Sequence, residues 1–282
     1  MTDNGCPLVT ALVPTYNGAA FIGRTLASLA RQTWPRLEIL VGDDASTDGT
    51  LAVVRDFAAR HPDTRVIERT GNLGWLGNSN DLMARARGEL MFFAFHDDVV
   101  APTYVERLAG ALRDRPAAVL AFSDMKVHEI DGTEGFYSFR RLEGRSSAVG
   151  RGLVMLRRPA GWWVPNRGLF RASAWRRVGG IRPNDRGEYS ADWTWLLHLS
   201  LLGPFVRVPE TLCDKYYQKG SISKQWPHDA AQVAALWRAG VAEIRRSPLD
   251  PWSKGVLIAP LMVFPHLGGR VKKALRKVFP PA

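Results

Sequence analysis

Residues 38–50 read Glu-Ile-Leu-Val-Gly-Asp-Asp-Ala-Ser-Thr-Asp-Gly-Thr, and this stretch says more about the fold than any other in the chain. Its apolar half is typical of a short buried strand, and its polar half ends that strand with two adjacent carboxylates, Asp43 and Asp44. A second pair, Asp97 and Asp98, follows another apolar run. Because adjacent carboxylates raise each other's proton affinity, two such pairs at strand ends indicate a bound cation or polar ligand.

Strand patterns and helix patterns alternate along the first 125 residues. Short apolar runs predict strands at residues 8–13, 38–41, 65–68, 90–95 and 119–122. Apolar residues at helical spacing predict helices at residues 19–30, 51–59, 79–87 and 102–114. This alternation predicts an α/β fold with a Rossmann-like, mostly parallel central sheet flanked by helices. Ligands of such sheets bind at the carboxyl ends of the strands, which is where both acidic pairs lie.

The regular alternation of strand and helix patterns ends after residue 125. Residues 131–158 are rich in Gly and Arg and predict loops and short strands. Helices are expected next at residues 172–178 and 192–202, and a strand at residues 206–217. We therefore divide the chain into residues 1–125, residues 126–228 and a helical tail of residues 229–282, with the first boundary lying inside one domain.

Length and composition fit one globular domain with an appendage. The chain has 282 residues, 46% of them hydrophobic and 23% charged, which is enough to bury a full core. Two cysteines do not suggest a disulfide framework and no signal-peptide pattern is present, so we expect a cytoplasmic protein. The apolar run at residues 256–264 is interrupted by Pro260 and is shorter than the roughly 20 residues that span a bilayer.

The formal net charge is +11, and part of it is concentrated near the C-terminus. Five basic residues alternate with apolar ones at a spacing that gives one helix a cationic and an apolar face: Arg270, Lys272, Lys273, Arg276 and Lys277. Two interpretations are open, a helix on the inner face of the cell membrane and a solvated terminal helix packed on its own domain. Nucleic acid is not an expected partner, because the other basic residues are scattered and form no nucleic-acid-binding motif.

Six short motifs occur in order along the chain. They are residues 13–18, residues 32–33, residues 38–50, residues 72–74 with Asn80, residues 88–89 and the pair Asp97-Asp98. This series resembles glycosyltransferase family 2, the inverting, sugar-nucleotide-dependent enzymes of GT-A fold. The resemblance continues through Gly179-Gly180 and Asp192-Trp193 to about residue 223. It implies that the first part of the chain binds a nucleotide sugar and that the second binds the acceptor.

The resemblance also implies roles for single residues. Asp98 is expected to bind Mn²⁺ or Mg²⁺ directly, and Asp97 to contact the ribose or sugar of the donor. Asp44 is expected to accept a hydrogen bond from a uracil ring. The other residues expected on the nucleotide side are Pro14, Thr15, Tyr16, Asn17 and Asn80. Considered alone, the pair Asp43-Asp44 also fits a strand-end turn that caps the next helix.

Asp192 is the candidate general base, since it matches an acidic position that precedes a helix in the resembled family. A carboxylate there would remove the proton of the acceptor hydroxyl as the new bond forms. The alternative is a helix N-cap. Trp162, Trp163 and Trp193 are candidate acceptor-binding residues, because aromatic rings lie against sugar faces, and the alternative for each is a place in the core.

This sequence departs from the resembled pattern at two places. Phe95 stands where the family often has the first acid of Asp-x-Asp-Asp, and no histidine follows the late strand. Lys219 is expected to meet the diphosphate as a point charge instead. These departures leave the strength of metal dependence open.

The predicted function is transfer of a sugar, most simply from a UDP-sugar, to a saccharide or lipid-linked acceptor in the synthesis of cell-surface polysaccharide or glycolipid. One alternative is a sugar-nucleotide nucleotidyltransferase, but the Gly-rich basic loop that it needs after the first strand is absent at residues 15–19. Another is a degenerate member that only binds a nucleotide or a glycan. The series of acids at Asp44, Asp97, Asp98 and Asp192 disfavours it.

Overall fold

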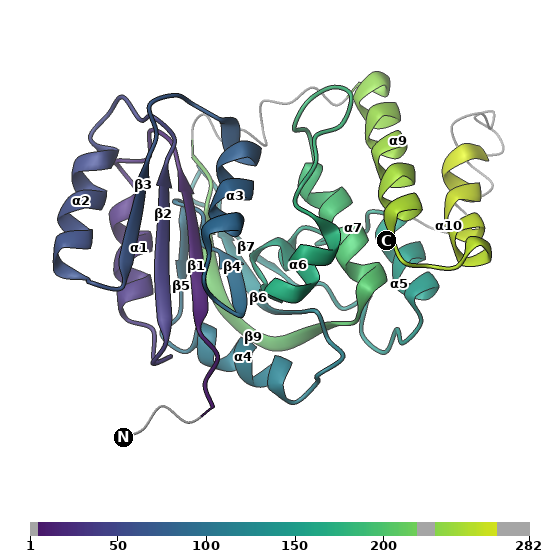
Figure 1. Ribbon diagram of the computed structural model, residues 1–282, viewed down its shortest axis with the longest axis horizontal. Helices are drawn as coiled ribbons and strands as arrows, with labels where there is room; N and C mark the ends of the chain where they lie inside the picture. The colour runs from purple at the N-terminus through teal and green to yellow at the C-terminus, as the bar shows by residue number, and fades with distance from the viewer. Residues whose placement is uncertain (1–4, 219–228, 264–282) are drawn as a thin grey trace.

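The computed structural model describes residues 5–218 and 229–263, and it contains a single mixed sheet with helices on both sides (Figure 1). The strands are β1 (Val9–Thr15), β2 (Leu37–Asp43), β3 (Thr64–Glu68), β4 (Leu90–Phe93), β5 (Asp98–Val100), β6 (Leu120–His128), β7 (Glu134–Tyr137), β8 (Leu169–Arg171) and β9 (Phe205–Tyr216). The helices are α1 (Ile22–Ala30), α2 (Thr50–Arg60), α3 (Gly74–Arg85), α4 (Tyr104–Arg113), α5 (Ala148–Leu156), the 3₁₀ helix η1 (Val164–Arg167), α6 (Ala172–Val178), α7 (Ala191–Leu202), α9 (Ala230–Arg246) and α10 (Pro251–Val263).

The sheet has nine strands in the order β3-β2-β1-β4-β8-β6-β9-β5, with β7 paired to β6. The first four strands in this order are parallel, as the alternating sequence pattern predicted. Beyond them, β8 is antiparallel to both of its neighbours, and β5 is antiparallel to β9. The α/β fold is therefore confirmed, but the sheet as a whole is mixed rather than mostly parallel. The change in strand direction begins at β8, which runs antiparallel to β4.

Strand β1 is buried on both faces, because helices cover both sides of the parallel half of the sheet. Its register pairs Thr15 with Asp43 of β2, and Asp43 in turn pairs with Glu68 of β3. The carboxyl ends of these strands therefore meet at one edge. Loops that leave this edge carry the polar residues predicted to form a site.

The C-terminal helices form a second cluster, seen beside the sheet in Figure 1 as α5, α7, α9 and α10. Helix α7 is buried almost all round because α5, α6 and α9 pack against it. One buried contact joins α7 to α9, where His198 Nδ1 lies 2.7 Å from Glu243 Oε2. Helix α10 contacts α5 and α9. Residues 229–263 are therefore helical, as predicted, and are packed on the domain.

One sequence expectation is corrected by the elements themselves. Helix α5 forms within residues 131–158, where loops and short strands were expected. Strand β6 is continuous through residue 125, where the sequence placed a boundary between two subregions of one domain. Among the described residues, none of the helices is long and apolar enough to cross a membrane. The basic stretch at residues 270–277 lies outside the described residues.

Candidate active site

A cavity of about 800 Å³ opens at the carboxyl ends of β1, β2 and β4. Most of the residues singled out from the sequence line it, namely Pro14, Thr15, Tyr16, Asn17, Asp44, Asp97, Trp162, Trp163 and Asp192. Its volume is in the range of small-molecule sites, which is about 300 to 1,000 Å³. The sheet edge, the loop after β4 and the start of α7 therefore converge on one site.

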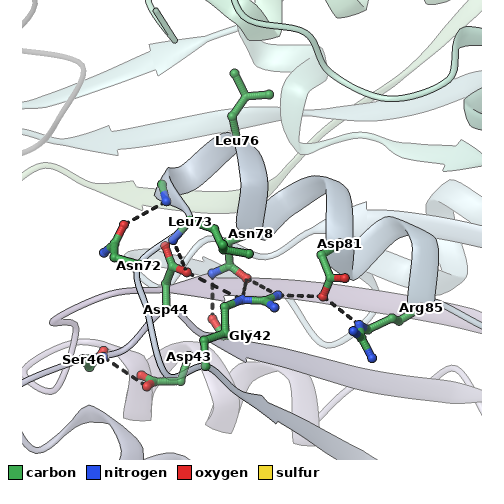
Figure 2. Close-up of polar contacts among 12 residues, drawn as sticks. Gly42, Asp43, Asp44, Ser46, Asn72, Leu73, Leu76, Asn78, Asp81 and Arg85 are labelled. Atoms are coloured by element: carbon green, nitrogen blue, oxygen red, sulfur yellow. Dashed lines mark hydrogen bonds and ion pairs between the residues drawn. The ribbon is translucent and has the colours of Figure 1, made fainter.

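Asp44 lies at the end of β2, where its carboxylate is buried and held by defined contacts (Figure 2). Its Oδ1 accepts a hydrogen bond of 2.9 Å from the backbone N–H of Leu73 and lies 3.6 Å from Arg69 Nε. Arg69 is itself fixed, because it donates to Asn78 Oδ1 at 3.0 Å and to Asp81 Oδ2 at 2.8 Å. Asp44 is thus a fixed acceptor in the cavity wall. The neighbouring Asp43 accepts from the Ser46 N–H instead (Figure 2).

The loop after β1 is tied to the loops beside it. Asn17 has a positive φ of 48°, and its side-chain Oδ1 accepts from the Thr47 N–H at 2.8 Å. Thr15 Oγ1 lies 3.1 Å from Nδ1 of His96. Burial lowers the pKa of His96, so its imidazole is neutral at neutral pH. These bonds fix the nucleotide-side loop relative to both acidic pairs.

The acids of the pair Asp97-Asp98 face different surroundings. Asp97 lines the cavity, and its Oδ2 lies 3.5 Å from Lys215 Nζ. Burial alone would raise the pKa of Asp97, but Lys215 and then Arg167 outweigh it, so this pKa is below the usual value. Asp98 is 2% exposed, and its Oδ2 accepts a 2.9 Å hydrogen bond from Arg167 Nε. Burial raises the pKa of Asp98, against the opposing effect of Arg167.

This geometry does not favour the expectation that Asp98 binds a metal directly. Asp98 does not line the cavity, its Oδ2 is paired with Arg167 and its Oδ1 is buried without a partner, whereas Asp97 lines the cavity. No group of three or more His, Cys, Asp and Glu side chains arranged for a metal occurs in residues 5–218 or 229–263. Mg²⁺ that binds a nucleotide diphosphate needs only one or two protein carboxylates, since phosphate oxygens and waters complete its shell. Asp97 fits that single-ligand role.

Three cations that the sequence did not single out line the same cavity: Arg158, Arg167 and Lys215. The guanidinium of Arg167 lies 4.6 Å from the ring centre of Phe95, and that of Arg158 lies 5.3 Å from the ring centre of Trp162. Phe95, the residue that departs from the family pattern, therefore packs against the guanidinium of Arg167. Positive charge in this wall is suited to a diphosphate.

Asp192 lies in the first turn of α7 and lines the cavity. The N-cap of this helix is Ser190, so Asp192 is not the cap that the alternative interpretation required. Asn166 Nδ2 lies 3.4 Å from its Oδ2. Burial raises the pKa of Asp192, while the nearby Arg167 acts in the opposite direction. A carboxylate whose pKa is raised toward neutrality is suited to general-base work.

Two expected site residues, Trp193 and Asn80, do not line the cavity. Trp193 is 0% exposed, and its Nε1 donates to the Met155 carbonyl at 2.8 Å, so it is a core residue. The side-chain amide of Asn80 is engaged at both ends by the backbone of Ile181, at 2.8 Å each. Asn80 therefore ties α3 to the segment before α7. Lys219 lies outside the described residues.

Glu188 is a further acid in the cavity wall that the sequence did not indicate. Its Oε1 lies 3.3 Å from the backbone N–H of Leu76, and burial raises its pKa. It precedes Asp192 by four residues. A single acid in a loop without a repeating pattern has no sequence signal of its own.

The parallel strands, the acids at their carboxyl ends and the buried carboxylate of Asp192 fit one class of protein, the GT-A-type glycosyltransferases. The chain belongs to glycosyl transferase family 2, whose sequence profile matches residues 10–152. It is 26% identical over 256 residues to the chondroitin synthase of Escherichia coli. That match covers 86% of this chain and 34% of the synthase, so the chain spans about a third of that enzyme's length.

Solved structures share the fold. The structure of S. aureus TarS in complex with UDP-GlcNAc has a TM-score of 0.72 at 18% identity, over 90% of this chain and 71% of that one. The mannosyltransferase PcManGT from Pyrobaculum calidifontis, in complex with GDP-Man and Mn²⁺, has a TM-score of 0.56 at 21% identity, over 94% and 71% of the two chains. At these identities the likeness shows the fold alone.

Proposed function

We propose that this chain is an inverting glycosyltransferase that moves a sugar from a uridine diphosphate donor to a saccharide acceptor. The observation that carries the proposal is the meeting in one cavity of Asp44, Asp97 and Asp192, which come from three separate parts of the chain. Asp44 would accept a hydrogen bond from the base, and Asp97 would lie at the diphosphate. Asp192 would act on the acceptor.

The leaving group sets the electrostatic demand on the site. A nucleoside diphosphate gains negative charge as its bond to the anomeric carbon breaks, so fixed positive charge stabilises the transition state. Lys215, Arg158 and Arg167 supply such charge from the cavity wall. Mn²⁺ or Mg²⁺ bound through Asp97 would neutralise further phosphate charge as a Lewis acid. The bound metal of PcManGT supports this assignment by analogy of fold.

Transfer is a single displacement. The acceptor oxygen forms a bond to the anomeric carbon from the face opposite the diphosphate, the bond from that carbon to the diphosphate oxygen breaks, and Asp192 takes the hydroxyl proton. The products are the nucleoside diphosphate and the acceptor that carries the transferred sugar, with the configuration at the anomeric carbon inverted. Asn166, 3.4 Å from Asp192 Oδ2, would hold the carboxylate in position for that proton.

A membrane surface is the proposed place of action. Support comes from α10, whose Trp252 and Met262 are 81% and 55% exposed, and from the basic C-terminal sequence. Large exposed apolar side chains beside basic sequence suit an anionic bilayer surface. We propose that the transfer takes place in the synthesis of a saccharide polymer. The similarity of this chain to a chondroitin synthase supports that context.

The test is calorimetric titration of UDP, GDP and TDP, with and without Mn²⁺, together with turnover of the matching UDP-sugars. We expect Asp192→Asn to bind the nucleotide as the wild type does and to lose about 10²-fold to 10⁴-fold in turnover, because only proton removal is impaired. Asp97→Ala should lose the Mn²⁺-dependent part of nucleotide binding.

Asp185→Asn is the matched control. Asp185 is an exposed acid that pairs with Arg238 on the surface, and its loss should leave both binding and turnover unchanged. If no nucleotide binds to the wild type under either metal condition, the proposed function is wrong. Full turnover of Asp192→Asn would remove Asp192 from the base role.

A further inference from the structure

An aromatic surface continues from the cavity onto the β6–β7 hairpin. Trp162 and Trp163 line the cavity. The ring of Tyr137, on β7, lies against Trp163 with ring centres 5.2 Å apart and planes tilted by 52°. Tyr137 is 37% exposed, so part of this residue is accessible to solvent. The cavity wall is thereby extended by a residue from an element that takes no other part in the site.

Local packing holds Tyr137 in this place. The neighbouring Gly135 points to the same side of β7, and a Cβ there would lie only 2.8 Å from the Tyr137 ring. The ring thus folds back over the bare backbone of Gly135 and presents a flat surface. The register of the hairpin pairs Tyr137 with Met125 of β6, which is buried. This pairing holds β7 beside a core strand. A flat, fixed ring is suited to stacking because little side-chain entropy is lost on binding.

The aromatic surface leads away from the proposed base. Trp163 directly precedes η1, and Asn166 of η1 contacts Asp192 at 3.4 Å. Arg158 lies across Trp162 on the other side, 5.3 Å from its ring centre. If the reactive hydroxyl of an acceptor lies at Asp192, the part of the acceptor next to that hydroxyl would therefore contact Trp163. The part further from the hydroxyl would contact Tyr137.

We propose that Trp163 and Tyr137 form a subsite for a second sugar unit of the acceptor, so that the acceptor is an oligosaccharide rather than a single sugar. The ring faces carry partial negative charge and attract the C–H edges of a pyranose. The subsite rests on the proposed function, because it needs the reactive end of the acceptor at Asp192. The subsite specifies the acceptor of the proposed reaction as an oligosaccharide of at least two sugar units.

The experiment is a glycan array of mono-, di-, tri- and tetrasaccharides, probed with the full chain in the presence of UDP and Mn²⁺. We expect wild-type protein to retain oligosaccharides and not their single sugars. Calorimetry of the tightest array ligand should then give a dissociation constant that rises about threefold to tenfold in Tyr137→Ala, as expected for one stacking contact. Tyr137→Phe, which keeps the ring, should bind as the wild type does.

Phe136→Ala is the matched control. Phe136 is adjacent in sequence and 73% exposed, but successive strand residues point to opposite faces, so its ring lies away from Trp163. This variant should keep wild-type affinity. Equal affinity for single sugars and oligosaccharides, no retention of any saccharide, or equal losses in Tyr137→Ala and Phe136→Ala would overturn the subsite. Binding of UDP in the same samples separates these failures from failure of the proposed function.

Discussion

At the scale of single residues, Arg167 links the two acidic parts of the site. It forms the buried ion pair with Asp98, and its charge lowers the pKa of Asp97 and opposes the burial that raises the pKa of Asp192. Loss of this cation should therefore raise the pKa of Asp192. The proposed base, Asp192, would then be ionised only at higher pH, so we expect Arg167→Met to shift the acidic limb of the kcat/KM profile upward in pH.

The measurement is a pH profile of kcat/KM for both variants at position 167. Arg167→Lys keeps the charge and should leave the limb near its wild-type position, while Arg186→Met, at an exposed site, should not move it. Circular dichroism checks folding, because Arg167→Met leaves Asp98 buried without its cation. An unmoved limb in folded Arg167→Met would contradict the electrostatic role.

The sequence could indicate Asp44 and Asp97 because strand ends are visible in the apolar pattern, whereas Glu188 has no such signal. It could not tell which member of Asp97-Asp98 faces the cavity, since that depends on pairing between β5 and β9 and on the approach of Arg167. Nor could it single out Arg158 or Arg167, which come from segments without periodicity. Trp193 was misassigned because an apolar helix gives no sign of which aromatic ring is buried.

At the scale of elements, β2 is joined to its neighbours by a buried carboxylate. Glu38 is 2% exposed and accepts hydrogen bonds from Thr10 Oγ1 at 2.7 Å, Arg65 Nη1 at 2.7 Å and Arg87 Nε at 2.8 Å. Burial would raise its pKa, but the bonds from Thr10, Arg65 and Arg87 outweigh burial, and the pKa is lowered. The carboxylate therefore stabilises the fold while it is ionised.

We expect Glu38→Gln to lower the free energy of unfolding by about 2 kcal/mol at neutral pH, since a neutral amide oxygen replaces the carboxylate that accepts the charge-assisted hydrogen bonds of Arg65 and Arg87. A lowered folded-state pKa means that this contribution is full above the pKa of the unfolded chain and is lost as pH falls through the folded value. Urea unfolding at several pH values measures it. A difference between wild type and variant that stays constant down to acidic pH would contradict this account.

Helical and strand patterns predicted the elements from β1 to α4 apart from β5, because each of the others has a clear apolar period and Pro102 lies just before α4. They missed α5, whose sequence contains Gly150 and Gly152 and so resembles a loop. The structure gives a packing reason for one of them. A Cβ on Gly152 would lie 2.8 Å from Leu257 Cδ2, so the glycine permits close contact between α5 and α10. Such a requirement between distant segments has no local sequence signal.

At the scale of the whole molecule, the excess positive charge and the exposed face of α10 belong to the same end of the chain. Trp252 and Met262 are exposed on α10, and the net charge of +11 includes the basic residues that follow it. We expect the full chain to bind vesicles of phosphatidylcholine with phosphatidylglycerol, and to be released by salt, because each Lys or Arg near an anionic surface contributes about 1 kcal/mol.

Co-sedimentation of protein with vesicles measures this binding, and the aromatic contribution can be isolated with one pair of variants. Trp252→Ala should weaken binding, because an indole ring at the headgroup level adds apolar burial to the electrostatic attraction. Phe136→Ala, on β7 and apart from α10 in Figure 1, removes another highly exposed ring (73% against 81% for Trp252) and should bind as the wild type does. Equal sedimentation with neutral and anionic vesicles would contradict the electrostatic contribution of the basic residues. No sedimentation with either would favour a solvated tail packed on its own domain.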